Sequence, residues 1–192
     1  MQRGAQRESL GIEAGSRIKV WVLEEAGLGL HPERRRVWTR RGRRPIITRQ
    51  IKYQWDYLYG ALSLGAGEAH FAHLPGVSLN WAAGCRRDLA ASDPAALHVL
   101  LRDQAGFHLR DGDPRRPPRV RIVERPPCSP ELNPCQQLWD ILKDDLASRV
   151  HASIAKRRAA LKPTRRRYGE DPGAVLSLIG RPWMHAQLNA SP

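Results

Sequence analysis

Two acidic residues, Glu24 and Asp103, each follow a segment rich in apolar and β-branched residues. Such segments are typical of strands, so both acids are predicted at strand ends. Hard cations such as Mg²⁺ prefer carboxylate oxygens, and two ions about 3.5 to 4 Å apart can activate an attacking oxygen and stabilise a leaving one at a phosphodiester. The alternative is a purely structural role, because acids at strand ends also cap turns.

The elements that would position these acids alternate along the chain. Five segments have the strand pattern, namely 17–23, 57–63, 68–74, 97–102 and 119–123. The first three predict an antiparallel meander, and a helix is expected over 79–91, stopped by Asp93-Pro94. Alternating strand and helix afterwards predict an α/β fold with a mixed sheet flanked by helices.

The clearest helix signal begins at Asn133-Pro134, because Asn is a favoured N-cap and Pro is tolerated at the first helical position. An apolar stripe follows at spacings of three and four residues and would face the sheet. It consists of Leu132, Cys135, Trp139, Leu142 and Leu146. Beyond Ala152 we expect one or two further helices, with a basic break at Arg165, Arg166 and Arg167.

The charge balance points to a polyanionic partner. The chain of 192 residues has 32 Lys plus Arg against 19 Asp plus Glu, a formal net charge of +13. Such a balance is typical of proteins that neutralise nucleic-acid phosphates. A dense run of arginines is interrupted by Trp38 and has Gly42 and Pro45 at its end. It predicts a hairpin or loop that contacts the DNA backbone. The alternative is a solvent-exposed face without a partner, which is the commoner role of such charge runs. The run contains Arg34, Arg35, Arg36, Arg40, Arg41, Arg43 and Arg44.

Other classes of protein are disfavoured by the sequence. No apolar run of about 18 residues and no helix with one cationic face indicates a membrane partner. The first twenty residues lack a signal-peptide core, so we expect a cytoplasmic protein. Its three cysteines, Cys85, Cys128 and Cys135, form no CxxC pair and indicate reduced thiols rather than disulfides or a zinc knuckle.

A longer motif narrows the prediction. Ser129-Pro130-Glu131-Leu132-Asn133-Pro134, followed by Gln136, Leu138 and Trp139, resembles the signature of the last catalytic acid in the mariner superfamily of transposases, especially its bacterial insertion-sequence branch, the six-thirty group. Segments 21–29, 35–45, 57–61 and 103–108 resemble further parts of that family in the same order. The resemblance spans residues 17 to 190.

The resemblance implies a ribonuclease H-like domain in which an Asp, Asp, Glu triad binds Mg²⁺ or Mn²⁺. Such a domain cuts double-stranded DNA at transposon ends and joins the freed 3′-hydroxyl to target DNA, in the bacterial cytoplasm at the nucleoid. Asp103 matches the second acid. Glu24 stands where the family has Asp, and Gln136 stands where it has Glu. Glu24 and Asp103 are therefore the expected metal ligands, and an anionic ligand is missing at Gln136.

Alternatives remain open at the two altered positions. Glu25 could serve beside Glu24, although alternation along a strand would direct it to the opposite face. Gln136 also suits the third helical position, where it could reach back to Asn133 in a capping box. Glu131 is a conceivable substitute ligand that precedes the helix. We expect His108 to be a structural hydrogen-bonding residue near the site, because metal-bound water needs little help from a histidine.

We expect three parts in the chain: a disordered lead-in over 1–16, a catalytic-type domain over 17–150 and a helical extension of that domain over 151–192. The relatives usually carry helix-turn-helix modules ahead of this domain. We therefore expect a truncated copy, half of a split reading frame or a misplaced start. Three hypotheses follow: an impaired metal-dependent endonuclease and strand transferase, a dead remnant that binds DNA or forms a homodimer, and a basic nucleic-acid-binding protein of ribosomal type.

Overall fold

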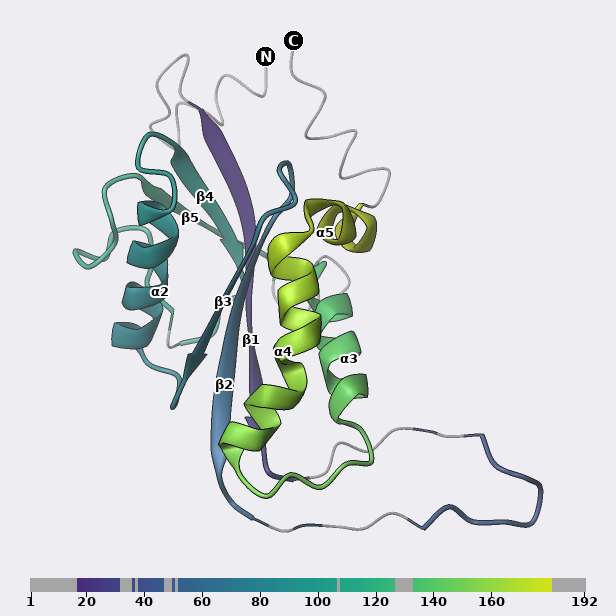
Figure 1. Cartoon of the computed structure of the whole chain (residues 1–192). Coiled ribbons are helices and arrows are strands. Elements are labelled where there is room, and N and C mark those ends of the chain that lie inside the picture. The colour runs from purple at the N-terminus through teal and green to yellow at the C-terminus, as the bar shows by residue number, and fades with distance from the viewer. Residues whose placement is uncertain are drawn as a thin grey trace.

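A five-stranded mixed sheet forms the centre of the domain in the computed structural model (Figure 1). The structure describes residues 17–31, 36, 38–46, 50, 52–106, 108–126 and 133–180. The strands are β1 (Ile18–Gly29), β2 (Trp55–Ser63), β3 (Ala69–Leu74), β4 (Leu97–Arg102) and β5 (Val120–Glu124). Their order is β3-β2-β1-β4-β5, with antiparallel pairing from β3 to β1 and parallel pairing from β1 to β5. The predicted mixed sheet is confirmed.

Strand β1 is longer than its sequence pattern indicated. We expected it to end at Glu24 and Glu25, but it continues to Gly29 and pairs with β2 along the added length, where Glu24 lies opposite Gly60 and Gly29 opposite Trp55. Glycines are poor strand formers in isolation, and pairing with an adjacent strand overrides that preference. The expectation of acids at the end of this strand was therefore wrong, because both lie in its middle.

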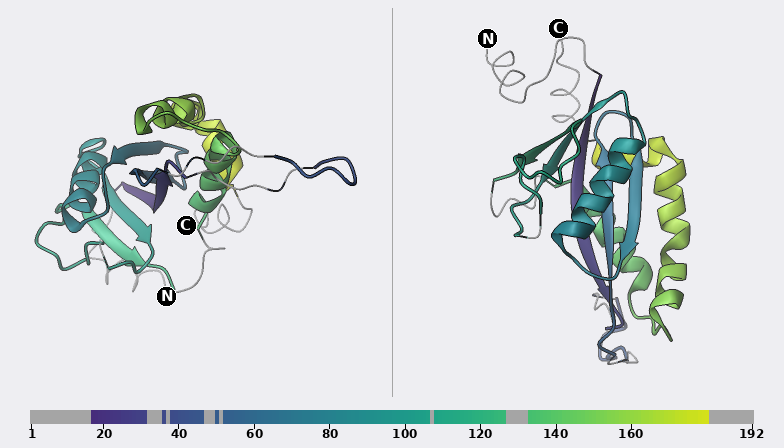
Figure 2. Two further views of the ribbon diagram at one scale, coloured as in Figure 1. Left: turned by 90° about the horizontal axis from the view of Figure 1, so that it is seen from below. Right: turned by 90° about the vertical axis from the view of Figure 1, so that its left-hand side faces the viewer.

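Helices cover both faces of the sheet. Helix α2 (Leu79–Ala91) lies on one face, and α3 (Cys135–Leu146), α4 (Ile154–Glu170) and α5 (Pro172–Ile179) lie on the other (Figure 2). Alternation along β1 divides its side chains between two cores. Trp21 and Leu23 pack on the α2 side, whereas Val22, Ala26 and Leu28 pack under α3, α4 and α5.

Helix α3 lies close against β2 because a glycine faces it. A Cβ at Gly60 would come within 2.6 Å of the indole ring of Trp139. The helix begins one residue later than expected, with Pro134 in the cap position and no side-chain cap hydrogen bond. The predicted Asn133 cap was therefore wrong in position, although the Asn133 side chain accepts from the N–H of Cys135 at 3.0 Å.

The C-terminal part contains two helices that meet at Asp171. Helix α4 begins at the Ser153 cap and runs through Pro163 and the three consecutive arginines to Glu170. The predicted basic break at Arg165, Arg166 and Arg167 was wrong, because the chain turns at Asp171, whose side chain caps α5 through the N–H of Ala174. Among the described residues, no helix has the length and apolar character needed to cross a bilayer.

Candidate active site

Glu24 lies on the face of the sheet that α3 covers. Its side chain is 20% exposed, and its Oε2 accepts from the side-chain amide of Asn133 and lies 3.4 Å from Nη2 of Arg125. Burial raises the pKa of the Glu24 carboxyl, Arg125 opposes that shift, and the nearby Asp103 adds to it. The carboxylate is thus partly desolvated and held by one cation and one amide.

Asp103 follows the last residue of β4, the strand that pairs in parallel with β1. The register aligns Val22 with Leu101, so its continuation brings Asp103 beside Glu24. The Asp103 side chain is 48% exposed, and its Oδ1 accepts from the N–H of Ala105 at 3.1 Å. The sheet therefore brings these two sequence-predicted acids together, one half-buried and one open to solvent.

Gln136 is the second residue of α3 and is exposed. Its backbone N–H donates to the carbonyl of Asn133 at 3.1 Å, and the Asn133 side chain reaches Glu24. The residue that precedes the α3 cap thus contacts Glu24, and the exposed neutral amide of Gln136 follows three residues later. Residues 127–132, including Glu131, lie outside the described residues.

His108 orients Asp103 from the α2 side. Its Nδ1 lies 3.4 Å from Nη2 of Arg86, which can only donate, so the ring proton belongs on Nε2. That nitrogen lies 2.9 Å from Oδ1 of Asp103 and 3.4 Å from Oε2 of Glu25. Burial and the Arg86 charge lower the His108 pKa to about 4, so a neutral ring donates to Asp103.

Glu25 lies on the opposite face from Glu24, as alternation along the strand requires. Its side chain is 7% exposed, and burial, followed by repulsion from Glu24, raises its pKa to about 8. It lines a cavity of about 110 Å³ between α2 and the sheet, beside the buried hydroxyl of Tyr59. Glu25 is therefore a buried neighbour of the site and faces away from the first turn of α3.

These residues do not fit a complete two-metal centre. Over the ranges that the structure describes, no group of three or more His, Cys, Asp or Glu side chains could hold a metal ion. Two carboxylates adjoin, the residue expected as the third ligand is the neutral Gln136, and the guanidinium of Arg125 lies against Glu24. A resident cation beside a ligand disfavours a second positive charge at the same oxygen.

Sequence patterns did not single out Arg125, and they assigned Asn133 to a cap. Arg125 follows β5 and is only 9% exposed, with a buried Nε that has no hydrogen-bond partner in the described part of the chain. Its only sequence signal is a charged residue between a strand and a proline pair. The Asn133-Pro134 step signalled a helix start, and its amide contact with Glu24 follows from tertiary packing.

The arginine-rich segment between β1 and β2 projects from the body of the domain (Figure 1). Its tip is a turn in which the N–H of Arg43 donates to the carbonyl of Arg40 at 3.0 Å, with Gly42 at a positive φ of 82°. The described arginines are exposed, namely Arg36, Arg40, Arg41, Arg43 and Arg44. Arg34 and Arg35 lie outside the described residues. We call residues 36–46 the arginine arm.

The same fold occurs in solved transposase structures. The Mos1 transposase paired-end complex with left transposon end superposes with a TM-score of 0.56 at 14% identity, over 94% of this chain and 59% of that one. The Mos1 strand transfer complex gives 0.55 at 15% identity, over 93% and 53%. The chain thus spans little more than half of those proteins. At these identities the likeness establishes a ribonuclease H-like fold.

The sequence pattern of the DDE superfamily endonucleases matches residues 19–158. This match covers most of the chain, which therefore belongs to the DDE superfamily endonuclease family, as the sequence motifs predicted. A curated relative, the uncharacterized protein y4pE/y4sA of Sinorhizobium fredii, is 26% identical over 133 residues, which are 68% of this chain and 98% of that protein.

Proposed function

We propose that this chain is the catalytic-type domain of a bacterial DNA transposase, with an acid site that binds divalent metal weakly. The observation that carries the proposal is the position of Glu24 on β1 beside Asp103, which directly follows the adjacent parallel strand β4 in a DDE-family fold. Its substrate would be double-stranded DNA, namely the transposon ends and the target. The protein would bind this DNA at the nucleoid. Its cofactor would be Mg²⁺ or Mn²⁺.

Three features of the site support weak metal binding in this proposal. Gln136 supplies no charge, Glu24 is one methylene longer than the family's Asp, and Arg125 already neutralises part of the Glu24 charge. Mg²⁺ demands near-ideal geometry from its carboxylate ligands. A second candidate function is therefore a remnant that only binds DNA or dimerises, and the unfilled third position favours it.

Restoring the acids tests the proposal. Gln136→Glu with Glu24→Asp should raise Mn²⁺ affinity by about tenfold or more, because an anionic ligand of the right length is regained. Calorimetric titration with Mn²⁺ measures the affinity directly, and non-specific nicking of plasmid DNA is the second readout. The native protein should show little or no nicking.

Asp103→Asn in the restored background is the control, and it should abolish any nicking gained, which excludes a contaminating nuclease. Unfolding by urea should be nearly unchanged in the restored protein, because Glu is tolerated near a helix N-terminus at least as well as Gln. Equal Mn²⁺ affinity in native and restored proteins would overturn the assignment of Gln136 to the third ligand position.

A further inference from the structure

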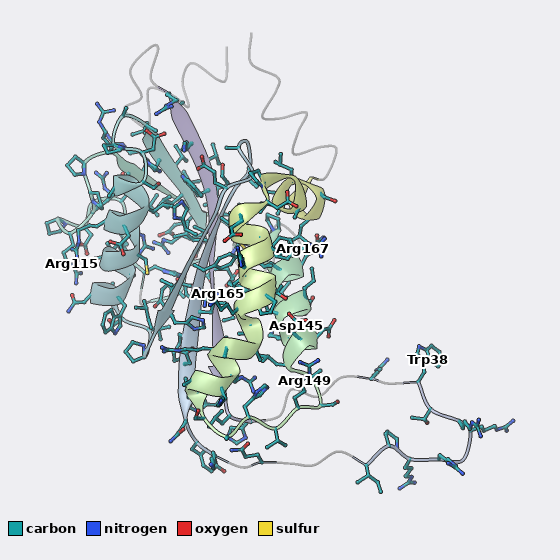
Figure 3. All side chains as sticks on the ribbon, in the orientation of Figure 1. Trp38, Arg115, Asp145, Arg149, Arg165 and Arg167 are labelled. Carbon is teal, nitrogen blue, oxygen red and sulfur yellow. The ribbon has the colours of Figure 1, made fainter. Side chains whose placement is uncertain are left out.

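Helix α4 has a composition that its packing does not require. Its 17 residues include seven cations and one acid, Glu170. The cations are Lys156, Arg157, Arg158, Lys162, Arg165, Arg166 and Arg167. Only Arg157, Leu161 and Tyr168 are buried, so most of this charge faces outward along the helix (Figure 3). Like charges one turn apart destabilise a helix, so this face is costly unless an anion meets it.

Within the part of the chain that the structure describes, acids pair with Arg158 and Arg166 of this group. Asp56 is 2% exposed and pairs with Arg158 through two contacts, of 2.5 and 3.0 Å, while also lying 2.6 Å from His73. Glu170 pairs with Arg166 at 2.8 Å in an exposed contact that contributes little. The local acids are thus largely engaged.

Arg165, which lines the groove described below, is partly desolvated. Its Nε is buried and has no hydrogen-bond partner among the residues that the structure describes. Burial lowers its pKa, Asp56 opposes that shift, and the neighbouring Arg158 reinforces it. A desolvated guanidinium beside a like charge is stabilised when an anion supplies the missing acceptor.

A groove runs between this part of α4 and strand β3. Its volume is about 490 Å³, and its lining consists of Phe71, Lys162, Arg165, Arg166, Gly169 and Glu170. Three of these side chains are cationic and one is acidic. No atom lies within 4 Å of the position a Cβ would take at Gly169, so the helix backbone is open there. We call this surface the α4 groove.

The start of α4, the helix whose later turns line the groove, contacts both ends of the connection that carries the arginine arm. The side chain of Lys52 donates to the carbonyl of Ala152 at 3.4 Å, and Arg157 donates to the carbonyl of His31 at 3.3 Å. These contacts join both ends of the β1–β2 connection to the start of α4. Figure 3 shows Arg149, Arg165 and Arg167 along the side of the molecule that leads to the arm.

We propose that the α4 groove binds the phosphate backbone of double-stranded DNA, as a second contact surface besides the arginine arm. This inference rests on the proposed function, which makes DNA the partner. Lys162, Arg165 and Arg166 would each meet phosphate oxygens, and the single turn that separates Lys162 from Arg166 gives the surface two contact points along the helix. Such contacts position a duplex without reading its sequence.

The test compares two triple variants of equal charge. One replaces Lys162, Arg165 and Arg166 with Gln; the control replaces Arg87, Arg115 and Arg119, exposed arginines of α2 and of the loop before β5, with Gln. Figure 3 places Arg115 beside α2, across the sheet from α4. Binding of a labelled duplex is measured by fluorescence anisotropy at several salt concentrations.

The α4 triple should make the slope of log affinity against log salt shallower by about two to three, since each phosphate contact contributes about 0.9. The control triple should change it by less than about one. Equal changes in both triples would reduce the effect to net charge and overturn the inference. If the α4 triple variant fails to fold, the same DNA-binding titration is made with Lys162→Glu and with Arg87→Glu as its control. Both side chains are exposed on helices, and only Lys162→Glu should weaken binding.

Failure of the inference is distinguishable from failure of the proposed function. If the native chain binds no duplex at low salt, the proposed function loses its partner and the α4 groove loses its ligand. If a variant of the arginine arm weakens binding and the α4 triple does not, only the second surface is wrong. A change of oligomeric state in the α4 triple, with DNA binding intact, would assign the groove to a protein contact instead.

Discussion

Two adjacent glutamates on one strand have opposite electrostatic environments. Glu24 has Arg125 and Asn133 against its carboxylate, whereas Glu25 is enclosed on the α2 side. Alternation along β1 produces this difference, because successive side chains point to opposite faces. Of the two, only Glu24 adjoins the first turn of α3, so the candidate acid site has one partly compensated carboxylate and one exposed carboxylate, Asp103.

The enclosure of Glu25 predicts a pH effect on stability. The unfolded chain releases this proton near the ordinary pKa of 4.5, whereas the folded protein keeps it to about pH 8. The free energy of unfolding should therefore fall as pH rises between these values. Glu25→Gln should remove that fall. The free energy of unfolding of the variant, relative to the native protein, should be about 1 to 3 kcal/mol higher at pH 8 than at pH 5. Urea unfolding at both pH values measures it.

His108 has the opposite effect on the pH dependence of stability, and it acts at lower pH. The folded pKa of His108 is about 4, below the ordinary 6.5, so the free energy of unfolding should fall as pH drops from 6.5 to 4.

Glu170→Gln is the control for Glu25→Gln, since Glu170 is 64% exposed. Parallel pH profiles for the native protein and Glu25→Gln would contradict the burial of this carboxyl.

At the scale of elements, the close contact of α3 with β2 fixes the first turn of α3. Trp139 lies directly over Gly60, which is opposite Glu24 in the register of β1 and β2. The same packing brings the Asn133 amide to Glu24. The helix is thus held by a ring against a backbone, a contact that tolerates little movement.

Adding one methyl group at Gly60 should displace this helix. Gly60→Ala places a Cβ 2.6 Å from the Trp139 ring, which should lower the free energy of unfolding by about 1 to 3 kcal/mol through overpacking. Chemical denaturation measures the loss. Gly65→Ala is the matched control, because nothing lies within 4 Å of that position. Trp139→Phe should recover part of the loss, and an unaffected Gly60→Ala protein would refute the close contact.

At the scale of the whole molecule, positive charge gathers on surfaces away from the two acids. The described part of the arginine arm has five exposed arginines, and α4 has seven cations against one acid. Over the ranges that the structure describes, no carboxylate pairs with the arginines of the arm. Electrostatic attraction to a polyanion is long-ranged and insensitive to sequence, so both surfaces suit the DNA backbone.

The arginine arm should supply much of the salt dependence of DNA binding. We expect weak, sequence-indifferent binding that weakens steeply with salt. Replacing the arginines of the arm, together with Arg34 and Arg35 just before it, with Ser should make the log–log slope shallower by about 0.9 per lost contact. The replaced set is Arg34, Arg35, Arg36, Arg40, Arg41, Arg43 and Arg44. Anisotropy titrations measure the slope. An unchanged slope would show that the run is a solvated face.

The sequence by itself determined the type and order of the elements, and it predicted two acids of the candidate site. Periodicity of two and of three to four residues is local, so α2 and β4 matched their predicted bounds, and parallel pairing then brings Asp103 beside Glu24. Motif spacing likewise identified the family before any contact was known.

Only the tertiary structure decided what surrounds those acids. Arg125 and Asn133 are 101 and 109 residues from Glu24, and no local pattern encodes a contact across such a separation. Pairing with β2 extended β1 past its glycines, and packing on β3 and α3 kept α4 helical through Pro163 and three arginines. Local propensities are worth about 1 kcal/mol per residue, or about 3 for Pro, and burial of a shared core outweighs them.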